Sequence, residues 1–258
     1  MKIGDLSDDR GLLLGDGLFE TVLAIDGRLI RFDRHLERMK RGCAIVGINP
    51  MNETVITVFA QQAIQEAGLL SGRAAVRLTL TAGAGRGLDR PFPAAGRLIV
   101  AATAAPPPGS APIRLAIASV RRNQASPLSR VKSLSYLDNI LARREAREAG
   151  AEEALMLNGR GELACAAAAN LFWVQDGRLF TPALECGVLD GILRGVVIEA
   201  AAAMGVETVQ TASPPDVLDR AEGVFLTNSL IGVRPAGDLA GRPLPASRLV
   251  ETLAGRCG

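Results

Sequence analysis

The run APPPGSAP, Ala105 to Pro112, divides the chain into two parts. Its four prolines make the segment stiff and remove the N–H groups that a central strand would need. We therefore expect a smaller N-terminal domain over residues 1–107, a Pro-rich linker over 108–113 and a larger C-terminal domain over 114–258. A chain of 258 residues is long enough for two modest domains.

Hydrophobic periodicity predicts both helices and strands on each side of the linker. Alternating apolar residues around the Asp26-Gly27 pair indicate a β-hairpin, and apolar residues at spacings of three and four follow it in a helical pattern. We expect helices near 32–48, 53–67, 135–149, 189–204 and 246–254, and strands near 17–30, 74–83, 96–104, 113–120, 153–158, 162–165, 170–182 and 223–228, the last leading into a loop. This order predicts an α+β fold.

Composition argues against several classes of function. A net charge near +2 and few aromatic residues do not favour binding to nucleic acid or to an anionic membrane. The single histidine, His35, and the absence of CxxC spacing argue against a metal site. Widely spaced cysteines, a polar start and the lack of a long apolar run lead us to expect a cytoplasmic protein with no membrane segment.

Lys132 is unusual in a chain that carries nearly all of its positive charge as arginine. The other lysines are Lys2, near the start of the chain, and Lys40, in the basic run RMKR, and we expect both to be solvated. Lys132 lies beside Val131 and a run rich in apolar residues, where burial lowers the pKa of an amine and favours Schiff-base chemistry. On this stretch alone, the commoner explanation is a lysine at the edge of an element with a packed stem.

Six motifs in order resemble the class IV, or fold type IV, pyridoxal-phosphate-dependent aminotransferase family. They are GDGLFET (15–21), HLERM (35–39), VKSLSYLDNILARREA (131–146), AANLFW (168–173), GVLDGILR (187–194) and TNSLIGVRP (227–235). The segment after Lys132 and the NLFW tetrad are most similar to the branch of aminodeoxychorismate lyases and D-amino-acid aminotransferases. The resemblance implies a two-domain fold type IV enzyme, pyridoxal 5′-phosphate as cofactor, a small amino substrate and a homodimer.

The same resemblance implies roles for individual residues. Lys132 matches the lysine that forms a Schiff base with the cofactor and acts as a general base. Arg38 matches the arginine that binds the cofactor phosphate, for which a fork of N–H donors is suited. We expect Tyr136 either to contact the cofactor or only to pack.

The remaining cofactor positions lie in the last two motifs. Gly191 and Ile192 begin a helix whose backbone N–H groups would bind the same phosphate. Leu189 matches the leucine that packs against the pyridine ring. Ser229 matches a hydroxyl that contacts the phosphate, with Thr227 and Asn228 next to it.

Cys165 departs from the family pattern. Members place a glutamate five residues before the asparagine of the NLF motif, here Asn170, to pair with the pyridine nitrogen. Glu162 lies three residues upstream on the opposite face of a regular strand, and could substitute only through a bulge. A missing carboxylate makes the cofactor a poorer electron sink, which disfavours a full proton shift more than an elimination.

We therefore predict an aminodeoxychorismate lyase that releases 4-aminobenzoate and pyruvate for folate biosynthesis. The alternatives are a D-amino-acid or other class IV aminotransferase, and a catalytically weakened homologue that binds the cofactor. Substrate carboxylates need cationic partners, and Arg77, Arg86 and Arg90 are candidates that the sequence does not separate.

Overall fold

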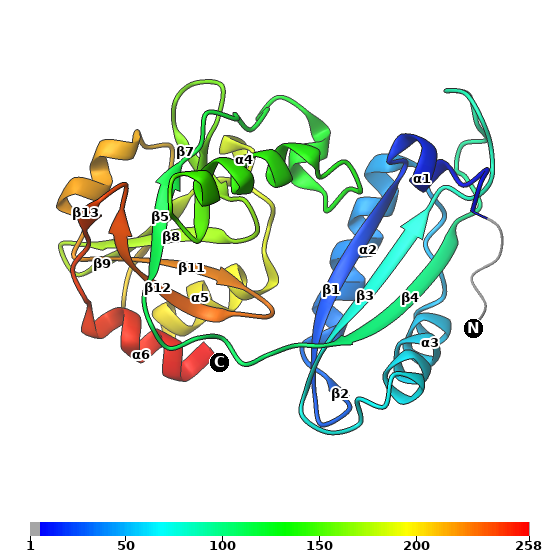
Figure 1. Ribbon diagram of the computed structural model, residues 1–258, viewed down its shortest axis with the longest axis horizontal. Coiled ribbons are helices and arrows are strands. Elements are labelled where there is room, and N and C mark those ends of the chain that lie inside the picture. The colour runs from blue at the N-terminus through cyan, green and yellow to red at the C-terminus, as the bar shows by residue number, and fades with distance from the viewer. Residues whose placement is uncertain (1–5, 258) are drawn as a thin grey trace. The chain divides into compact units, whose positions relative to one another are not determined.

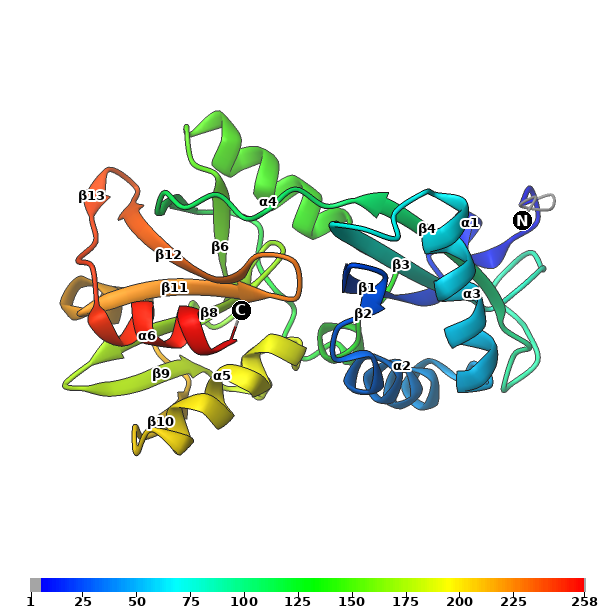
Figure 2. The ribbon, with the colours of Figure 1, turned by 90° about the horizontal axis from the view of Figure 1, so that it is seen from below.

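The computed structural model describes residues 6–257 and divides into two compact units (Figures 1 and 2). Unit 1 contains the chain up to Pro107 together with the short segment Val131–Ser135. Unit 2 contains Pro108–Arg130 and the chain from Tyr136 onward. The change at Pro107 lies next to the expected linker, whereas the return of Val131–Ser135 to unit 1 was not foreseen.

Unit 1 is an antiparallel sheet with two long helices on one face. The strand order is β2-β1-β3-β4, and β1 pairs with β3 over its whole length. Within the described residues, its elements are α1 (Arg10–Leu14), β1 (Gly17–Ile25), β2 (Arg28–Leu29), α2 (Phe32–Val46), α3 (Glu53–Glu66), β3 (Arg73–Thr81) and β4 (Arg97–Ala104).

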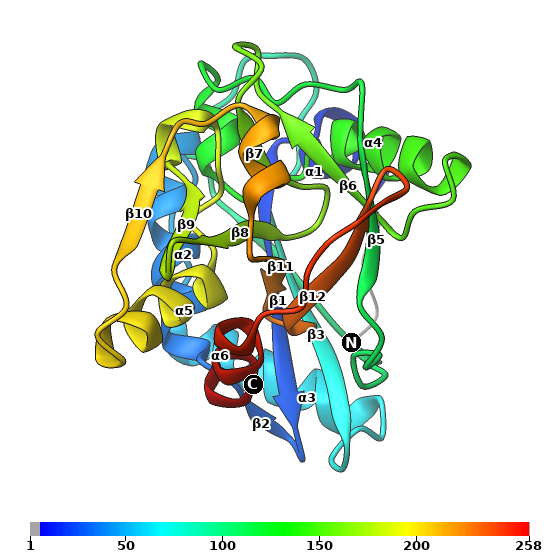
Figure 3. The same cartoon turned by 90° about the vertical axis from the view of Figure 1, so that its left-hand side faces the viewer.

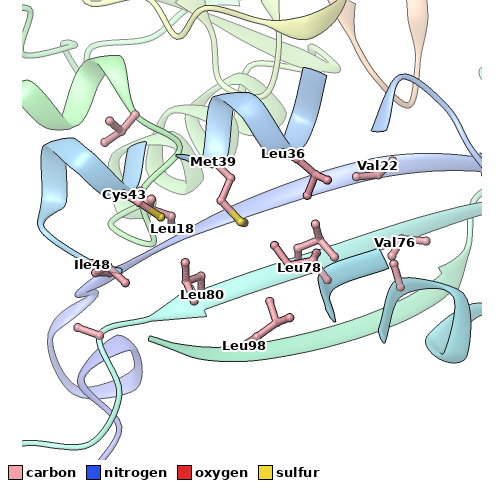
Figure 4. Close-up of a cluster of buried hydrophobic side chains, with 14 of the residues drawn as sticks. Leu18, Val22, Leu36, Met39, Cys43, Ile48, Val76, Leu78, Leu80 and Leu98 are labelled. Carbon is pink, nitrogen blue, oxygen red and sulfur yellow. The ribbon is translucent and has the colours of Figure 1, made fainter. Parts of the chain in front are cut away.

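Strand alternation decides which side chains enter the core of unit 1. Even-numbered residues of β1 and β3 point toward α2 and α3, and odd-numbered residues point to the opposite face. Figure 4 shows the side chains of α2 reaching down to the strands. The buried cluster includes Leu18, Val22, Leu36, Met39, Cys43, Ile56, Ile64, Val76, Leu78, Leu80 and Leu98.

The segment Val131–Ser135 runs antiparallel beside the start of β1. The Phe19 N–H donates to the Lys132 carbonyl at 2.8 Å, and Leu18 is bridged to Ser133. Lys132 therefore lies opposite Phe19, and its side chain belongs to the sheet face that points away from α2 and α3. Its neighbour Val131 points the other way and joins the core.

Unit 2 is built around a nine-stranded mixed sheet. The order along the sheet is β10-β9-β8-β11-β12-β5-β6-β7, with β13 paired to β12. Its strands and α-helices are β5 (Ile113–Ile117), α4 (Leu137–Glu148), β6 (Glu153–Leu157), β7 (Leu163–Ala166), β8 (Asn170–Gln175), β9 (Arg178–Pro182), α5 (Ile192–Ala203), β10 (Thr208–Thr211), β11 (Gly223–Asn228), β12 (Gly232–Leu239), β13 (Arg242–Pro243) and α6 (Arg248–Cys257). Short 3-10 helices cover Pro127–Arg130, Leu184–Cys186 and Pro215–Arg220.

Three large apolar clusters and one small one hold the described part of unit 2 together. Helices α5 and α6 pack on β8, β9 and β11 through residues such as Val197, Leu253 and Phe225 (Figure 3). Helix α4 packs its small residues Ala142 and Ala146 against β6 and β7. A third cluster fills the curled interior of the sheet. No helix within residues 6–257 combines the length and apolar character needed to cross a membrane.

The loop expected after β11 is instead a hairpin into β12. Gly232, Pro235 and Gly237 interrupt the apolar alternation of β12, so its sequence does not resemble a strand. The turn is closed by the Asn228 side chain, whose Oδ1 accepts from the N–H groups of Leu230 and Ile231 at 2.9 Å. The short elements α1, β10 and β13 were also not predicted.

The packing of β3 predicts the effect of one substitution in unit 1. Leu78 is fully buried between β1, β4 and α3, so Leu78→Ala should lower the free energy of unfolding by about 2–5 kcal/mol. Leu70→Ala is the matched control, because Leu70 is 58% exposed, and should cost under about 0.5 kcal/mol. Urea unfolding followed by circular dichroism measures both, and equal losses would contradict the assigned core.

Candidate active site

Lys132 and Arg77 both contact the ring of Phe19 on the face of the unit 1 sheet that lies opposite α2 and α3. The Lys132 Nζ lies 4.2 Å from the ring centroid, and the Arg77 Cζ lies 3.7 Å from it. The strand register explains why both side chains reach this ring. Lys132 lies opposite Phe19, and Arg77 pairs with Thr21, which is the next residue of β1 on the same face as Phe19. Two cations on one aromatic ring form a compact cationic site.

The surroundings of Lys132 make its amine a usable nucleophile. Burial is the largest effect and lowers the pKa of Lys132 to about 8. The negative charge of Glu20 acts to raise that pKa, while the positive charges of Arg38 and Arg77 lower it further. Neutral amine is therefore plentiful near pH 8, which is the form that attacks a carbonyl carbon.

Glu20, His35 and Arg38 form a buried charged cluster on the opposite face of β1. Arg38 Nε donates to Glu20 Oε1 at 2.8 Å and Arg38 Nη2 donates to Oε2 at 2.6 Å, while His35 Nδ1 lies 2.7 Å from Oε2. Burial acts to raise the pKa of Glu20, but the charge and hydrogen bonds of Arg38 and the contact with His35 lower it to about 2. The Glu20 carboxylate is thus ionised at neutral pH.

The charged cluster of Glu20, His35 and Arg38 was not predicted from the sequence. Glu20 interrupts the apolar positions 18, 22 and 24 of β1, so a carboxylate points toward the core. A charged residue at an inward position of an alternating strand is a signal that could have found it.

The three arginines proposed for substrate carboxylates have different surroundings. Arg77 lies beside Lys132 on Phe19. Arg90 donates to the Asp16 carboxylate at 2.9 Å and to the carbonyls of Val46 and Gly47 at 2.6 and 2.8 Å, so it holds its own loop in place. Arg86 is exposed in that loop. Of the three, Arg77 is the one whose contacts connect it to the lysine.

In unit 2, the start of α5 lies beside the start of β8. Gly191 is the N-cap of α5 and contributes no side chain to the first N–H groups of the helix. Asn170 Nδ2 donates to the Leu189 carbonyl at 2.9 Å, which fixes the approach to the helix. A Cβ at Gly191 would lie 1.9 Å from Asn170 Oδ1, so this close approach requires glycine.

Polar groups from the end of β11 lie at the same end of the sheet. Thr227 pairs with Asn170 across the β8–β11 ladder. Its Oγ1 is buried and has no hydrogen-bond partner among residues 6–257, although buried hydroxyls are normally paired. Ser229 follows in the turn that Asn228 closes, and Asn228 Nδ2 also donates to the Ala168 carbonyl at 2.9 Å.

Cys165 lies on β7 opposite Met156 and packs in the alanine-rich cluster beneath α4. Burial raises the pKa of the Cys165 thiol; the charge of Arg122 opposes this, and that of Glu153 adds to it. The thiol therefore stays protonated and supplies no negative charge at neutral pH. Tyr136, the N-cap residue of α4, is half-buried in the same unit.

The bulge that Glu162 would need is present between β6 and β7. Met156 pairs with Cys165 but Leu157 pairs with Leu163, so one residue of β7 is extra. The Glu162 carboxylate is nevertheless engaged in its own turn, where it accepts from Asn158 Nδ2 at 2.7 Å and from Arg160 Nε at 2.9 Å. These bonds do not favour Glu162 as a replacement for the missing carboxylate.

Similar proteins include branched-chain aminotransferases, D-alanine aminotransferases and aminodeoxychorismate lyases, according to their names. The sequence profile of the family described as amino-transferase class IV matches residues 17–238. A Methanocaldococcus jannaschii protein, provisionally named a branched-chain-amino-acid aminotransferase, is 32% identical over 94% of this chain and 85% of its own length. The aminodeoxychorismate lyase of Bacillus subtilis is 30% identical over 88% of this chain and 78% of its own length. The solved 4-amino-4-deoxychorismate lyase of Pseudomonas aeruginosa has a TM-score of 0.87 at 30% identity, covering 99% of this chain and 94% of that one.

The pKa of Lys132 can be tested in the cofactor-free protein. Trace acylation with acetic anhydride, read by peptide mass spectrometry, should show the reactivity of Lys132 rising through about pH 8 as the amine loses its proton. Exposed Lys40 in the same sample corrects for the reagent. A rise delayed to about pH 10 or above would mean that Lys132 is solvated.

The contact at the start of α5 predicts a local effect of added volume. Gly191→Ala should lower the free energy of unfolding by about 1–3 kcal/mol, because the new methyl group displaces the Asn170 side chain. Gly255→Ala is the control, because the added Cβ would meet no described atom within 4 Å beyond the adjacent residues and the backbone of its own helix, and the helix α6 favours alanine. Urea unfolding followed by the fluorescence of Trp173, the only tryptophan, measures both variants. A neutral Gly191→Ala would refute the tight contact.

Proposed function

Because the chain belongs to the class IV aminotransferases, a family of pyridoxal-phosphate-dependent enzymes with the fold type IV architecture, we propose that it is an aminodeoxychorismate lyase. The substrate would be 4-amino-4-deoxychorismate, and the products 4-aminobenzoate and pyruvate, a step toward folate. The observation that carries this choice is the neutral, buried thiol of Cys165 at the position where the family pattern has a carboxylate. An elimination that forms an aromatic ring depends less on electron withdrawal by the cofactor than a transamination does.

The residues of unit 2 fit the phosphate of the cofactor. The N-terminus of α5 presents backbone N–H groups without a side-chain cap. At the same end of the sheet, Thr227 Oγ1 is buried and has no hydrogen-bond partner among the described residues. Such a group of donors suits a phosphate. We propose that Gly191, Ile192 and Ser229 bind the phosphate, and that Leu189 packs against the ring.

Unit 1 would contribute the charged groups. Arg38 would bind the phosphate through its guanidinium, and Lys132 would hold the cofactor covalently through Nζ. When bound, pyridoxal phosphate supplies an electron sink that makes bonds at the substrate carbon easier to break. Lys132 Nζ, with its pKa near 8, is suited to accept and return a proton close to neutral pH.

Arg77 is the residue that we propose for a substrate carboxylate. Its guanidinium is held over Phe19 next to the Lys132 amine, and it lies at an outward position of β3. A planar guanidinium can donate two parallel hydrogen bonds to a carboxylate and so orient the substrate relative to Nζ.

Transamination is the second candidate function. The relative from M. jannaschii, which carries a branched-chain aminotransferase name, favours it, and the Lys132 site suits it equally. A weakened homologue that binds the cofactor without efficient turnover is the third candidate. The replacement of the family's carboxylate by Cys165 favours this candidate. Homodimer formation and a cytoplasmic location stay predictions.

A spectrum and a product assay test the proposal together. With pyridoxal phosphate, the wild type should develop an absorbance band of the bound cofactor, and Lys132→Ala should lose both the band and nearly all turnover because no amine holds the carbonyl carbon. Lys40→Ala, an exposed change on α2, should keep both. The assay should detect 4-aminobenzoate and pyruvate from aminodeoxychorismate.

The outcomes separate the three candidates. Turnover of D-alanine or branched-chain amino acids without lyase activity would support the second candidate. A band with no turnover of any substrate would support the third. A wild type without the band would remove Lys132 from its proposed role.

A further inference from the structure

Adjacent residues of β1 contact the two proposed cationic groups of unit 1 from opposite faces of the sheet. Phe19 contacts the Lys132 amine through its ring and the Lys132 carbonyl through its N–H. Glu20, the next residue, points toward α2 and binds Arg38. One short piece of strand therefore holds both the proposed nucleophile and the proposed phosphate ligand.

Burial of the Glu20 carboxylate costs free energy, because its surroundings are largely apolar. Its side chain is 1% exposed and is flanked along β1 by Leu18 and Val22, which belong to the apolar core. A buried carboxylate must be paired, and a buried ion pair is often no more stabilising than apolar residues of the same volume. Stability alone therefore does not explain why a charge occupies this position.

We propose that Glu20 is a positioning residue that orients the Arg38 guanidinium and offsets the positive charge of the two arginines near Lys132. This inference rests on the proposed function, because it gives Glu20 its role through Arg38 and Lys132. It assigns no contact between Glu20 and the substrate.

The geometry explains the orientation of Arg38. Glu20 accepts two hydrogen bonds along one edge of the guanidinium, from Nε and Nη2, which fixes the plane of that group. His35 lies one turn before Arg38 on α2 and contacts the same carboxylate through Nδ1, so the carboxylate is held as well. These contacts therefore also fix the direction in which the remaining N–H groups of the Arg38 guanidinium point.

The charges around Lys132 explain the second part of the role. Arg38 on α2 and Arg77 on β3 place positive charge near the amine, and Glu20 on β1 opposes them, with His35 in contact with Glu20. Two cations without that anion would weaken the amine as a base. A more basic amine accepts a proton more readily, so the charge of Glu20 keeps Lys132 able to act as a general base.

The first experiment measures the pKa of Lys132 in the cofactor-free protein by trace acylation. Glu20→Gln keeps the size and the acceptor oxygen but removes the charge, so the pKa of Lys132 should fall by roughly one unit or more. Glu37→Gln is the control, because Glu37 is an exposed glutamate on the same helix as Arg38, and it should leave the pKa unchanged. A folded Glu20→Gln protein with the wild-type pKa would overturn the electrostatic role.

The second experiment measures how much the cofactor phosphate adds to binding, as the ratio of the Kd values of pyridoxal and pyridoxal phosphate. Glu20→Asp keeps the charge but withdraws the carboxylate by one methylene, so this ratio should fall by about tenfold while the pKa of Lys132 changes less than in Glu20→Gln. An unchanged ratio would overturn the orienting role. Glu20→Asp also carries the test if Glu20→Gln fails to fold.

The two experiments distinguish this inference from the proposed function. A wild type that shows no preference for pyridoxal phosphate over pyridoxal would refute the phosphate site and the orienting role together. A fall in the pKa of Lys132 in Glu20→Gln would still support the electrostatic role, because that measurement uses no cofactor. A wild type that binds as proposed, with variants that change neither readout, would refute the inference alone.

Discussion

The pairing of Val131–Ser135 with the edge of β1 is the interaction on which the candidate site depends. The hydrogen bond from the Phe19 N–H to the Lys132 carbonyl sets the register, and the register decides the face on which each side chain lies. A shift of one residue would send Lys132 toward the apolar core and bring Val131 out of it. The charges that adjust the amine act only because this pairing brings Lys132 to the strand that carries Glu20.

The two units offer different kinds of polar groups. Unit 1 contributes formal charges, in the lysine, the two arginines and the buried carboxylate. Unit 2 contains mainly neutral donors and acceptors, at the start of α5, the start of β8 and the end of β11. Neutral donors at a helix start can bind an anion without a buried cation, whereas covalent chemistry at a lysine amine near neutral pH requires surroundings that lower its pKa, and burial is the largest of these effects on Lys132.

The sequence predicted the regular elements better than the contacts between them. Helix α2 and the β1–β2 hairpin follow from periodicity, because each buries one face and local spacing records it. Lys132 stood out because the chain contains few lysines, but its partner strand lies more than a hundred residues away, and no local pattern encodes that pairing. Arg90 looked equivalent to Arg77 until its bonds to Asp16 and to two carbonyls gave it a structural role.

Because unit 1 is discontinuous in sequence, its completion has a consequence for biosynthesis. A nascent chain that has emerged only as far as the linker can form β1, β3 and β4 with their helices, but the early part of β1 still has an unpaired edge. That edge is covered only when Val131–Ser135 has left the ribosome, after part of unit 2 has been translated. The segment that completes the sheet of unit 1 is also the one that carries Lys132. The proposed nucleophile therefore reaches its place beside Phe19 only when this last strand pairing forms.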